Sequence, residues 1–160
     1  MNNVFLLTGG NMGDRQQNLL QAGKAIEQKV GKIVSSSKIY ESDAWGKTDQ
    51  QSFYNQVLQI YSSFSPIEIL RLVLDIEQNM GRERIIKYGP RLIDIDILFY
   101  NNAVIKTSEL TVPHPELQNR RFALAPLAEL AANYLHPVLH KTVAGLLSEC
   151  KDQLMVKALS

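Results

Sequence analysis

The chain has 160 residues, of which 45% are hydrophobic and 21% are charged, and its net charge is +1. This length suits one domain, and a single cysteine, Cys150, excludes an intramolecular disulfide. The balanced charge gives no indication of a nucleic-acid or membrane surface, and no apolar run reaches the length of a membrane span. The opening residues, MNNVFLLTGG, form too short an apolar run for a secretory signal. We therefore expect one cytoplasmic domain over residues 1–160.

The predicted elements alternate between strands and helices. In chain order we expect a strand over 4–8, a helix over 15–29, strands over 31–42 and 53–61, a helix over 66–80 and a strand over 92–100. Asp14 is the predicted N-cap of the first helix. The second helix has Ser65 and Glu68 in capping-box positions and Pro66 at its first position. Two further helices are expected near 122–132 and 143–150, and the last ten residues carry no clear pattern.

The order β-α-β-β-α-β of the first six elements is that of the ferredoxin-like fold. We therefore predict an α+β protein with a ferredoxin-like βαββαβ core, additional C-terminal helices and long catalytic loops. With helices on both faces of the sheet, the molecule would be a three-layer α/β/α sandwich.

Two carboxylates lie within the last predicted strand, in the sequence GPRLIDIDILFY. Alternate side chains of a strand share a face, so Leu92, Asp94, Asp96 and Leu98 are expected on one face and Ile93, Ile95, Ile97 and Phe99 on the other. Two aspartates roughly 7 Å apart along one face can hold divalent cations whose other ligands are water and phosphate. The alternative is that they are only the solvated face of an edge strand.

The segment before this strand favours the metal-and-phosphate interpretation. Residues 82–91 read RERIIKYGPR, with four cations and one acid. Guanidinium groups bind phosphate in bidentate fashion and stabilise charge on transferring phosphoryl oxygens. Taken alone, such a run is more often a solvated loop, but it directly precedes the two acids. Together these features match the needs of a nucleoside triphosphate.

Several ordered motifs make the chain similar to a known family. GRERIIKYGPRLIDIDILFY and LTVPHPELQNRRF are the most specific, and TGGNMGD, YESDAWG and FYNQV follow the same order as weaker motifs. In these stretches the chain resembles 6-hydroxymethyl-7,8-dihydropterin pyrophosphokinases of folate biosynthesis, over about residues 5–131. The resemblance implies transfer of pyrophosphate from ATP to the hydroxymethyl group of the pterin, with release of AMP.

The resemblance also implies the nucleotide side of a site. Asp94 and Asp96 would hold two Mg²⁺ ions, and Asp96 is the better candidate to accept the hydroxyl proton. Arg82 and Arg84 match arginines of a loop that closes over the phosphates. The further positions that match nucleotide or phosphate contacts are Glu77, Lys87, Arg91, His114 and Arg120.

A flat heteroaromatic substrate calls for stacking rings and a planar hydrogen-bonding group. Phe53 and Asn55 share a face of their predicted strand. By the resemblance, Phe53 and Phe122 would enclose the pterin ring and Asn55 would bind its edge. Ser42, Asp43, Ala44 and Tyr88 are the remaining predicted substrate contacts. For either phenylalanine alone, core packing is the better explanation.

There are three alternative functions for a chain of this kind. A dinucleotide-binding module is disfavoured because the first loop lacks the G-x-G-x-x-G spacing, and a P-loop kinase because no Walker A motif occurs. A non-catalytic ferredoxin-like binding domain is the third, and it leaves the arginines and the aspartate pair unrelated. We expect a monomer whose partners are the pterin and ATP, with no nucleic acid or membrane.

Overall fold

The computed structural model describes residues 1–44, 50–81 and 92–159 of the chain. Its centre is an antiparallel sheet, in which β1 (Asn2–Gly10) and β4 (Phe53–Ser62) pair along nearly their whole lengths. The strand order is β5-β1-β4-β3-β8, with β2 also paired to β4. The remaining strands are β2 (Lys32–Ser36), β3 (Tyr40–Ser42), β5 (Asp94–Tyr100) and β8 (Val156–Ala158). The predicted ferredoxin-like arrangement is confirmed.

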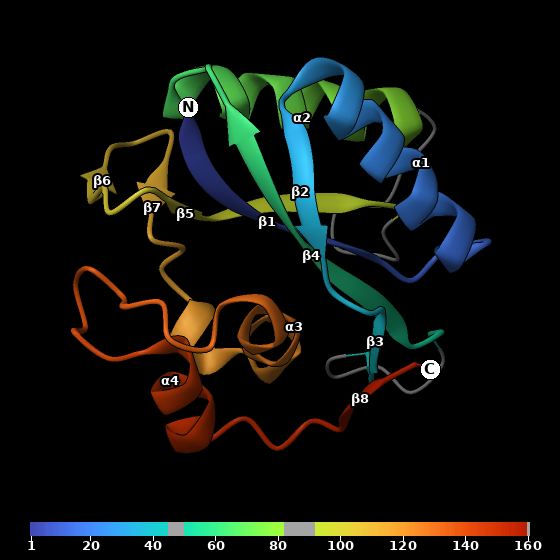
Figure 1. Ribbon diagram of the computed structural model, residues 1–160. Coiled ribbons are helices and arrows are strands. Elements are labelled where there is room, and N and C mark those ends of the chain that lie inside the picture. Colours follow the sequence, from blue (N-terminus) through green and yellow to red (C-terminus); the bar gives the residue numbers. More distant parts are fainter. Residues whose placement is uncertain (45–49, 82–91, 160) are drawn as a thin grey trace.

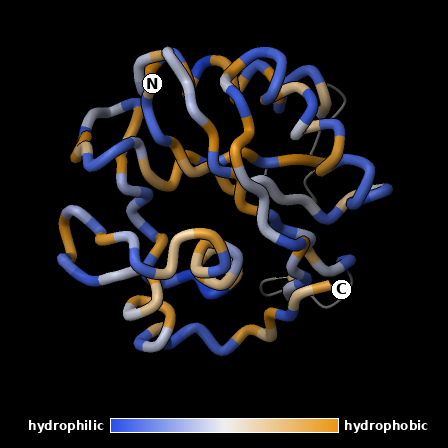
Figure 2. The backbone as a smooth tube through the Cα atoms, viewed as in Figure 1, coloured by the Kyte–Doolittle hydropathy of each residue, from blue (hydrophilic) through white to orange (hydrophobic). Residues whose placement is uncertain are grey.

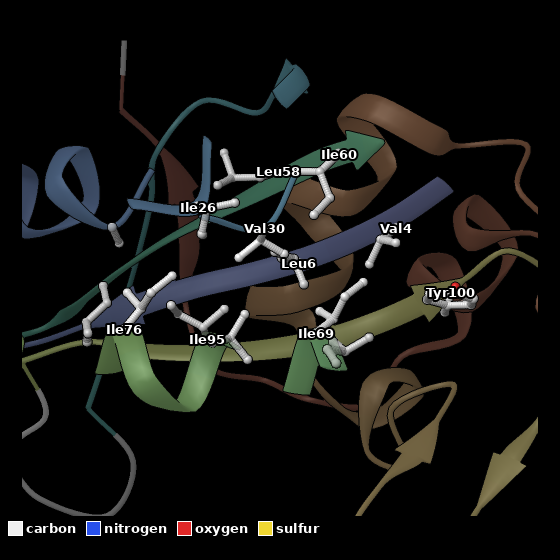
Figure 3. Packing of buried hydrophobic residues seen from close by; sticks show 14 of the residues in the cluster. Val4, Leu6, Ile26, Val30, Leu58, Ile60, Ile69, Ile76, Ile95 and Tyr100 are labelled. Carbon is white, nitrogen blue, oxygen red and sulfur yellow. The ribbon is translucent and has the colours of Figure 1, made fainter. Parts of the chain in front are cut away.

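Two helices cover one face of the sheet, α1 (Arg15–Lys29) and α2 (Pro66–Met80) (Figure 1). Both begin where the caps predict: the side chain of Asp14 accepts a hydrogen bond from the backbone N–H of Gln17, and Ser65 and Glu68 form a complete capping box. Their apolar sides pack on the inner residues of the strands (Figure 3). The labelled members of this core are Val4, Leu6, Ile26, Val30, Leu58, Ile60, Ile69, Ile76, Ile95 and Tyr100.

The opposite face carries the C-terminal helices α3 (Arg121–Ala131) and α4 (Val143–Glu149), preceded by the short 3₁₀ helix η1 (Leu117–Asn119). A second core lies between these helices and the sheet and includes Phe5, Leu7, Val57, Leu124 and Leu127. Figure 2 shows hydrophobic colour along the central strands, between the two helical layers. The predicted three-layer sandwich is therefore confirmed.

Two strands differ from the prediction. The expected single strand over 31–42 is broken into β2 and β3 at Ser37, where the side-chain hydroxyl, in place of the backbone carbonyl, accepts the hydrogen bond from the N–H of Val57 at 3.0 Å. The C-terminal residues also form an element that the sequence did not indicate. They are β8, which pairs with β3 from Tyr40 to Ser42.

The predicted alternation in the last strand fails at one position. Phe5 pairs with Phe99 while Leu6 pairs with Ile97, so Leu98 is the extra residue of a β-bulge in β5. Leu98 and Phe99 consequently both pack in the core beneath α3 and α4. The expectation that Phe99 shares a face with Ile97 is thus wrong, whereas the alternation from Ile93 to Ile97 holds.

A two-stranded ribbon of β6 (Ile105–Lys106) and β7 (Thr111–Val112) completes the described elements. None of the helices in the described ranges is long and apolar enough to cross a lipid bilayer.

The bulge leads to a stability prediction. Phe99 is fully buried and packs its ring against Phe5, Tyr134 and His136 at centroid distances of 6.3, 4.8 and 5.6 Å. Removing a buried phenylalanine ring costs about 3–5 kcal/mol, so Phe99→Ala should lower the free energy of unfolding in urea by about that amount. Val104→Ala, at a side chain that is 61% exposed, is the control and should change little. A small effect at Phe99 would contradict the placement of its ring in this core.

Candidate active site

A cavity of about 480 Å³ opens on the α3 side of the sheet, next to the part that α3 and α4 cover. This volume lies within the usual range for small-molecule sites. Its described walls come from six separate stretches of the sequence. They are β1 (Leu7, Gly9), the end of β3 (Ser42, Asp43), the start of β4 (Phe53, Asn55), the start of β5 (Asp94, Asp96), the region around η1 and the start of α3 (Glu116, Asn119, Arg120, Phe122) and the segment after α4 (Asp152, Leu154).

Asp94 and Asp96 both line this cavity, and both are half-buried. They lie opposite Gly9 and Leu7 of β1, so the strand pairing fixes the spacing of the two carboxylates. The intervening Ile95 points the other way, into the core beneath α1 and α2. The predicted separation of the acidic face from the isoleucine face is therefore present in the structure.

The backbone between the two aspartates is held from outside the sheet. The N–H of Ile95 donates a 2.5 Å hydrogen bond to the carboxylate of Glu77, near the end of α2. Because β5 pairs only with β1 in the described part of the sheet, this carboxylate takes the place that a neighbouring strand would fill. Glu77 does not line the cavity, so its role as a nucleotide contact stays a prediction.

Asn55 is 4% exposed, and its amide is positioned by two strands. Its Nδ2 donates to the hydroxyl of Ser42 at 3.3 Å, across the β3–β4 pair. Its Oδ1 lies against Gly9, where an added Cβ would be only 2.2 Å away. A planar amide is thus fixed at the cavity wall, with Gly9 giving it the necessary room.

Two aromatic rings line the same cavity from different layers. Phe53 comes from the start of β4 and Phe122 from the first turn of α3. The guanidinium of Arg120 lies over the ring of Phe122, 5.7 Å from its centroid, within the range of a cation–π interaction. The structure therefore brings both predicted rings to one site, with a cation beside one of them.

His114 lies beside this site as a neutral hydrogen-bond donor. Burial lowers the pKa of His114; the Asp96 carboxylate opposes this effect and the Arg120 guanidinium adds to it. Its Nδ1 accepts a hydrogen bond from the N–H of Glu116 at 3.1 Å, which places the proton of the neutral ring on Nε2. An Nε2–H donor of this kind suits a phosphate oxygen.

The described part of the cavity lining carries a charge that favours a cation. Among the described residues it includes one arginine, Arg120, and five acids: Asp43, Asp94, Asp96, Glu116 and Asp152. Carboxylate oxygens are the ligands that Mg²⁺ prefers, and Mg²⁺ keeps several waters or phosphate oxygens as its other ligands. Among the described residues, no group of three or more acids, histidines or cysteines is placed to enclose an ion. The two aspartates thus fit an ion that shares its coordination with water and a phosphorylated substrate.

Some predicted site residues cannot be placed in this geometry. Arg82, Arg84, Lys87, Tyr88 and Arg91 lie outside the described residues. Ala44 is described and half-buried but is not part of the cavity lining.

The cavity also contains residues that the sequence prediction missed, namely Leu7, Gly9, Glu116, Asn119, Asp152 and Leu154. Glu116 and Asn119 lie in the LTVPHPELQNRRF motif and could have been proposed from it. Asp152 and Leu154 follow the last helix, where no local pattern points to a site.

Comparison with known proteins identifies the family. The model of the 7,8-dihydro-6-hydroxymethylpterin-pyrophosphokinase family matches residues 5–132. The chain belongs to this family. The family and the class of enzyme predicted from the motifs, a pyrophosphokinase, are thereby confirmed, in preference to a non-catalytic binding domain.

Individual relatives agree with this membership. The 2-amino-4-hydroxy-6-hydroxymethyldihydropteridine pyrophosphokinase of Aquifex aeolicus is 43% identical over 141 residues, which cover 88% of this chain and 88% of that protein. The protein of the same name from Bacillus subtilis is 43% identical, over 81% of this chain and 79% of that one. The folic acid synthesis protein FOL1 of Dictyostelium discoideum is 42% identical, and the chain spans only 21% of its length.

Solved structures support the fold of this pyrophosphokinase. The HPPK-DHPS of Plasmodium falciparum, crystallised with pteroate, superposes with a TM-score of 0.73 at 19% identity. The match covers 92% of this chain and 42% of that one.

The Glu77 contact leads to a prediction for hydrogen exchange. Glu77→Ala leaves the Ile95 N–H without its acceptor, and a hydrogen bond to a charged group contributes about 1.5–3 kcal/mol. Amide exchange of a peptide containing Ile95 should therefore become faster. Gln78→Ala, the exposed neighbour on α2, is the control. Equal protection in both variants would mean that Glu77 does not hold this edge of β5.

Proposed function

We propose that this chain transfers pyrophosphate from ATP to the hydroxymethyl group of 6-hydroxymethyl-7,8-dihydropterin, as its family name implies. The observation that carries the proposal is the single cavity that contains both a fixed amide with aromatic rings and a pair of aspartates. Such a cavity accommodates a flat heterocycle at one end and a phosphorylated group at the other.

The pterin end is formed by Asn55, Phe53 and Phe122. The buried amide of Asn55 presents donor and acceptor groups to the edge of the heterocycle, and the two rings contact its faces. Ser42 fixes the amide and Asp43 adds a polar wall. Ala44 and Tyr88 are assigned to this end by the family resemblance alone.

The nucleotide end is formed around Asp94 and Asp96, which would bind two Mg²⁺ ions. These ions would neutralise triphosphate charge and polarise its oxygens. His114 offers an uncharged donor to a phosphate and Arg120 a charged one. By the resemblance, Arg82, Arg84, Lys87 and Arg91 add cations and Glu77 lies on the nucleotide side.

The reaction is an in-line displacement between these two ends. The pterin hydroxyl oxygen forms a bond to the β-phosphorus of ATP, the bond from that phosphorus to the α–β bridging oxygen breaks, and AMP leaves with that oxygen. The hydroxyl proton must be removed, and by the resemblance Asp96 is a better candidate acceptor than Asp94. Holding both substrates in register is the main catalytic contribution of the fold.

We further propose that residues 1–160 act as one monomeric cytoplasmic domain.

The decisive assay identifies the nucleotide product. The purified chain is incubated with ATP, Mg²⁺ and the hydroxymethyl-dihydropterin, and nucleotides are separated by chromatography. AMP that forms only when the pterin is present supports the proposal. ADP would indicate transfer of a single phosphoryl group, and pterin binding without turnover would indicate a binding domain.

The aspartates lead to a mutational prediction. Asp94→Asn or Asp96→Asn should lower kcat by roughly 10³-fold or more, because several kcal/mol of charge stabilisation are lost and about 1.4 kcal/mol corresponds to a factor of ten. Asp75→Asn, an exposed acid on α2, is the control. Chelation with EDTA should stop the wild-type reaction. A near-normal rate in either site variant would contradict the role of the pair.

Gly9 leads to a prediction for pterin affinity. The Cβ of Gly9→Ala would lie 2.2 Å from Oδ1 of Asn55, so the amide must move from its position. We expect the KM for the pterin to rise by about tenfold or more, as when one hydrogen-bonding group of a polar site is displaced. Gly23→Ala on α1 has no atom within 4 Å of the new Cβ and is the matched control. An unchanged KM would separate Asn55 from pterin recognition.

A further inference from the structure

The C-terminal segment between α4 and β8 lines the same cavity as the aspartates. Asp152 and Leu154 are part of the lining, although they lie beyond residues 5–132, which the family model matches. Figure 1 shows this segment leaving α4 and crossing to β8, which lies beside β3. It therefore joins α4 to a strand that pairs with β3, the strand that carries Ser42.

The first attachment of the segment is to the start of α3. The backbone N–H and Nε of Arg121 donate to Oδ2 and the carbonyl of Asp152 at 3.1 and 3.0 Å, and a terminal nitrogen donates to the carbonyl of Cys150 at 2.8 Å. The N-cap residue Arg120 makes no side-chain capping bond, so the carboxylate of Asp152 satisfies a helix N–H that would otherwise lack an intrahelical acceptor.

The same carboxylate shapes the segment itself. Oδ1 of Asp152 accepts a hydrogen bond from the N–H of Leu154 at 3.0 Å, which closes a turn. The half-buried side chain of Leu154 lies in the cavity wall directly after this turn. One residue thus binds both the helix that carries Phe122 and the backbone of Leu154.

The second attachment is to β3. Val156 pairs with Ser42, Lys157 lies 3.7 Å from the carboxylate of Glu41, and the N–H of Leu159 donates to the carbonyl of Ile39 at 2.8 Å. Because Ser42 holds the amide of Asn55, Leu154 lies only two residues from the pairing that supports the predicted pterin edge.

We propose that this C-terminal segment is a wall of the pterin end of the cavity, in which Leu154 contacts the heterocycle and Asp152 and Arg121 position it. The inference rests on the proposed function. An apolar side chain fixed between two attachments adds contact area for a flat ring at little entropic cost. The segment lies between the carriers of the two predicted pterin contacts, which assigns it to the pterin rather than the nucleotide.

The test measures pterin and nucleotide binding separately. Isothermal titration calorimetry is performed with 6-hydroxymethyl-7,8-dihydropterin in the presence of Mg²⁺ and α,β-methylene-ATP, and with the nucleotide analogue alone. Leu154→Ala should weaken pterin binding by about tenfold, as for loss of apolar contacts in a pocket, and leave affinity for the analogue unchanged. Gln153→Ala, the exposed residue between Asp152 and Leu154, is the control and should leave both unchanged.

Positioning is tested by Asp152→Asn, whose amide group accepts through one oxygen only. We expect it to raise the KM for the pterin with kcat and the KM for ATP unchanged, a split that a general loss of stability would not produce. Leu154→Met, which keeps the apolar volume, should restore most of the pterin affinity lost in Leu154→Ala.

Unchanged pterin affinity in Leu154→Ala, or equal weakening of both ligands, would overturn the inference. Wild-type turnover to AMP is measured in the same preparation, because its absence would instead contradict the proposed function.

Discussion

The two carboxylates of β5 are the constraint on which the site depends. Ile93, Ile95 and Ile97 are buried against α1 and α2, so strand alternation forces Asp94 and Asp96 onto the opposite face. Pairing with β1 sets the distance between the two carboxylates along that face. The carboxylate of Glu77 accepts a hydrogen bond from the N–H of Ile95, which lies between the two acids. Two like charges so close together are unfavourable unless water or a cation stabilises them. An open cavity on that side meets this requirement, because it admits water and, in the proposed function, divalent ions shared with a triphosphate would bind there.

The remaining architecture determines what lies opposite the acids. The layer of α1 and α2 covers one face, whereas α3 and α4 cover part of the other and leave the cavity beside them. The bulge at Leu98 divides β5 into two functional parts. Before it, one face is apolar and the other acidic; after it, Leu98 and Phe99 both anchor the strand in the core beneath α3 and α4. The same strand therefore joins a packed core to a solvated site. This anchoring fixes the positions of the two acids relative to Asn55 and Phe122.

Local sequence signals predicted the elements whose cause is local. The caps at Asp14 and Ser65 and the apolar spacing gave the bounds of α1 and α2, and the alternation up to Ile97 placed both aspartates. Features that depend on distant partners were missed or wrong. The strand breaks at Ser37, where the Ser37 hydroxyl binds the N–H of Val57, which is distant in sequence. The bulge moves Phe99 to the other core, and β8 forms only by pairing with β3.

At the site, the sequence indicated that the amide of Asn55 needs a hydrogen-bond partner. That this partner is Ser42, and that Gly9 lies against the amide, follows from the strand register. Asp152 and Leu154 reach the cavity only through tertiary contacts with Arg121 and β3. The roles of most nucleotide-side residues came from the family resemblance rather than from the spacing of the residues.

We propose that Asp94 and Asp96 together hold the metal ions of the nucleotide. The most direct test counts bound Mn²⁺ by electron paramagnetic resonance, as a substitute for Mg²⁺, in the presence of saturating α,β-methylene-ATP. This analogue keeps the triphosphate charge but cannot be cleaved between its α- and β-phosphates. We expect two ions per wild-type chain and the loss of at least one in both Asp94→Asn and Asp96→Asn, with the fold retained by circular dichroism. The same metal count in the wild type and in both variants would contradict this role of the two aspartates.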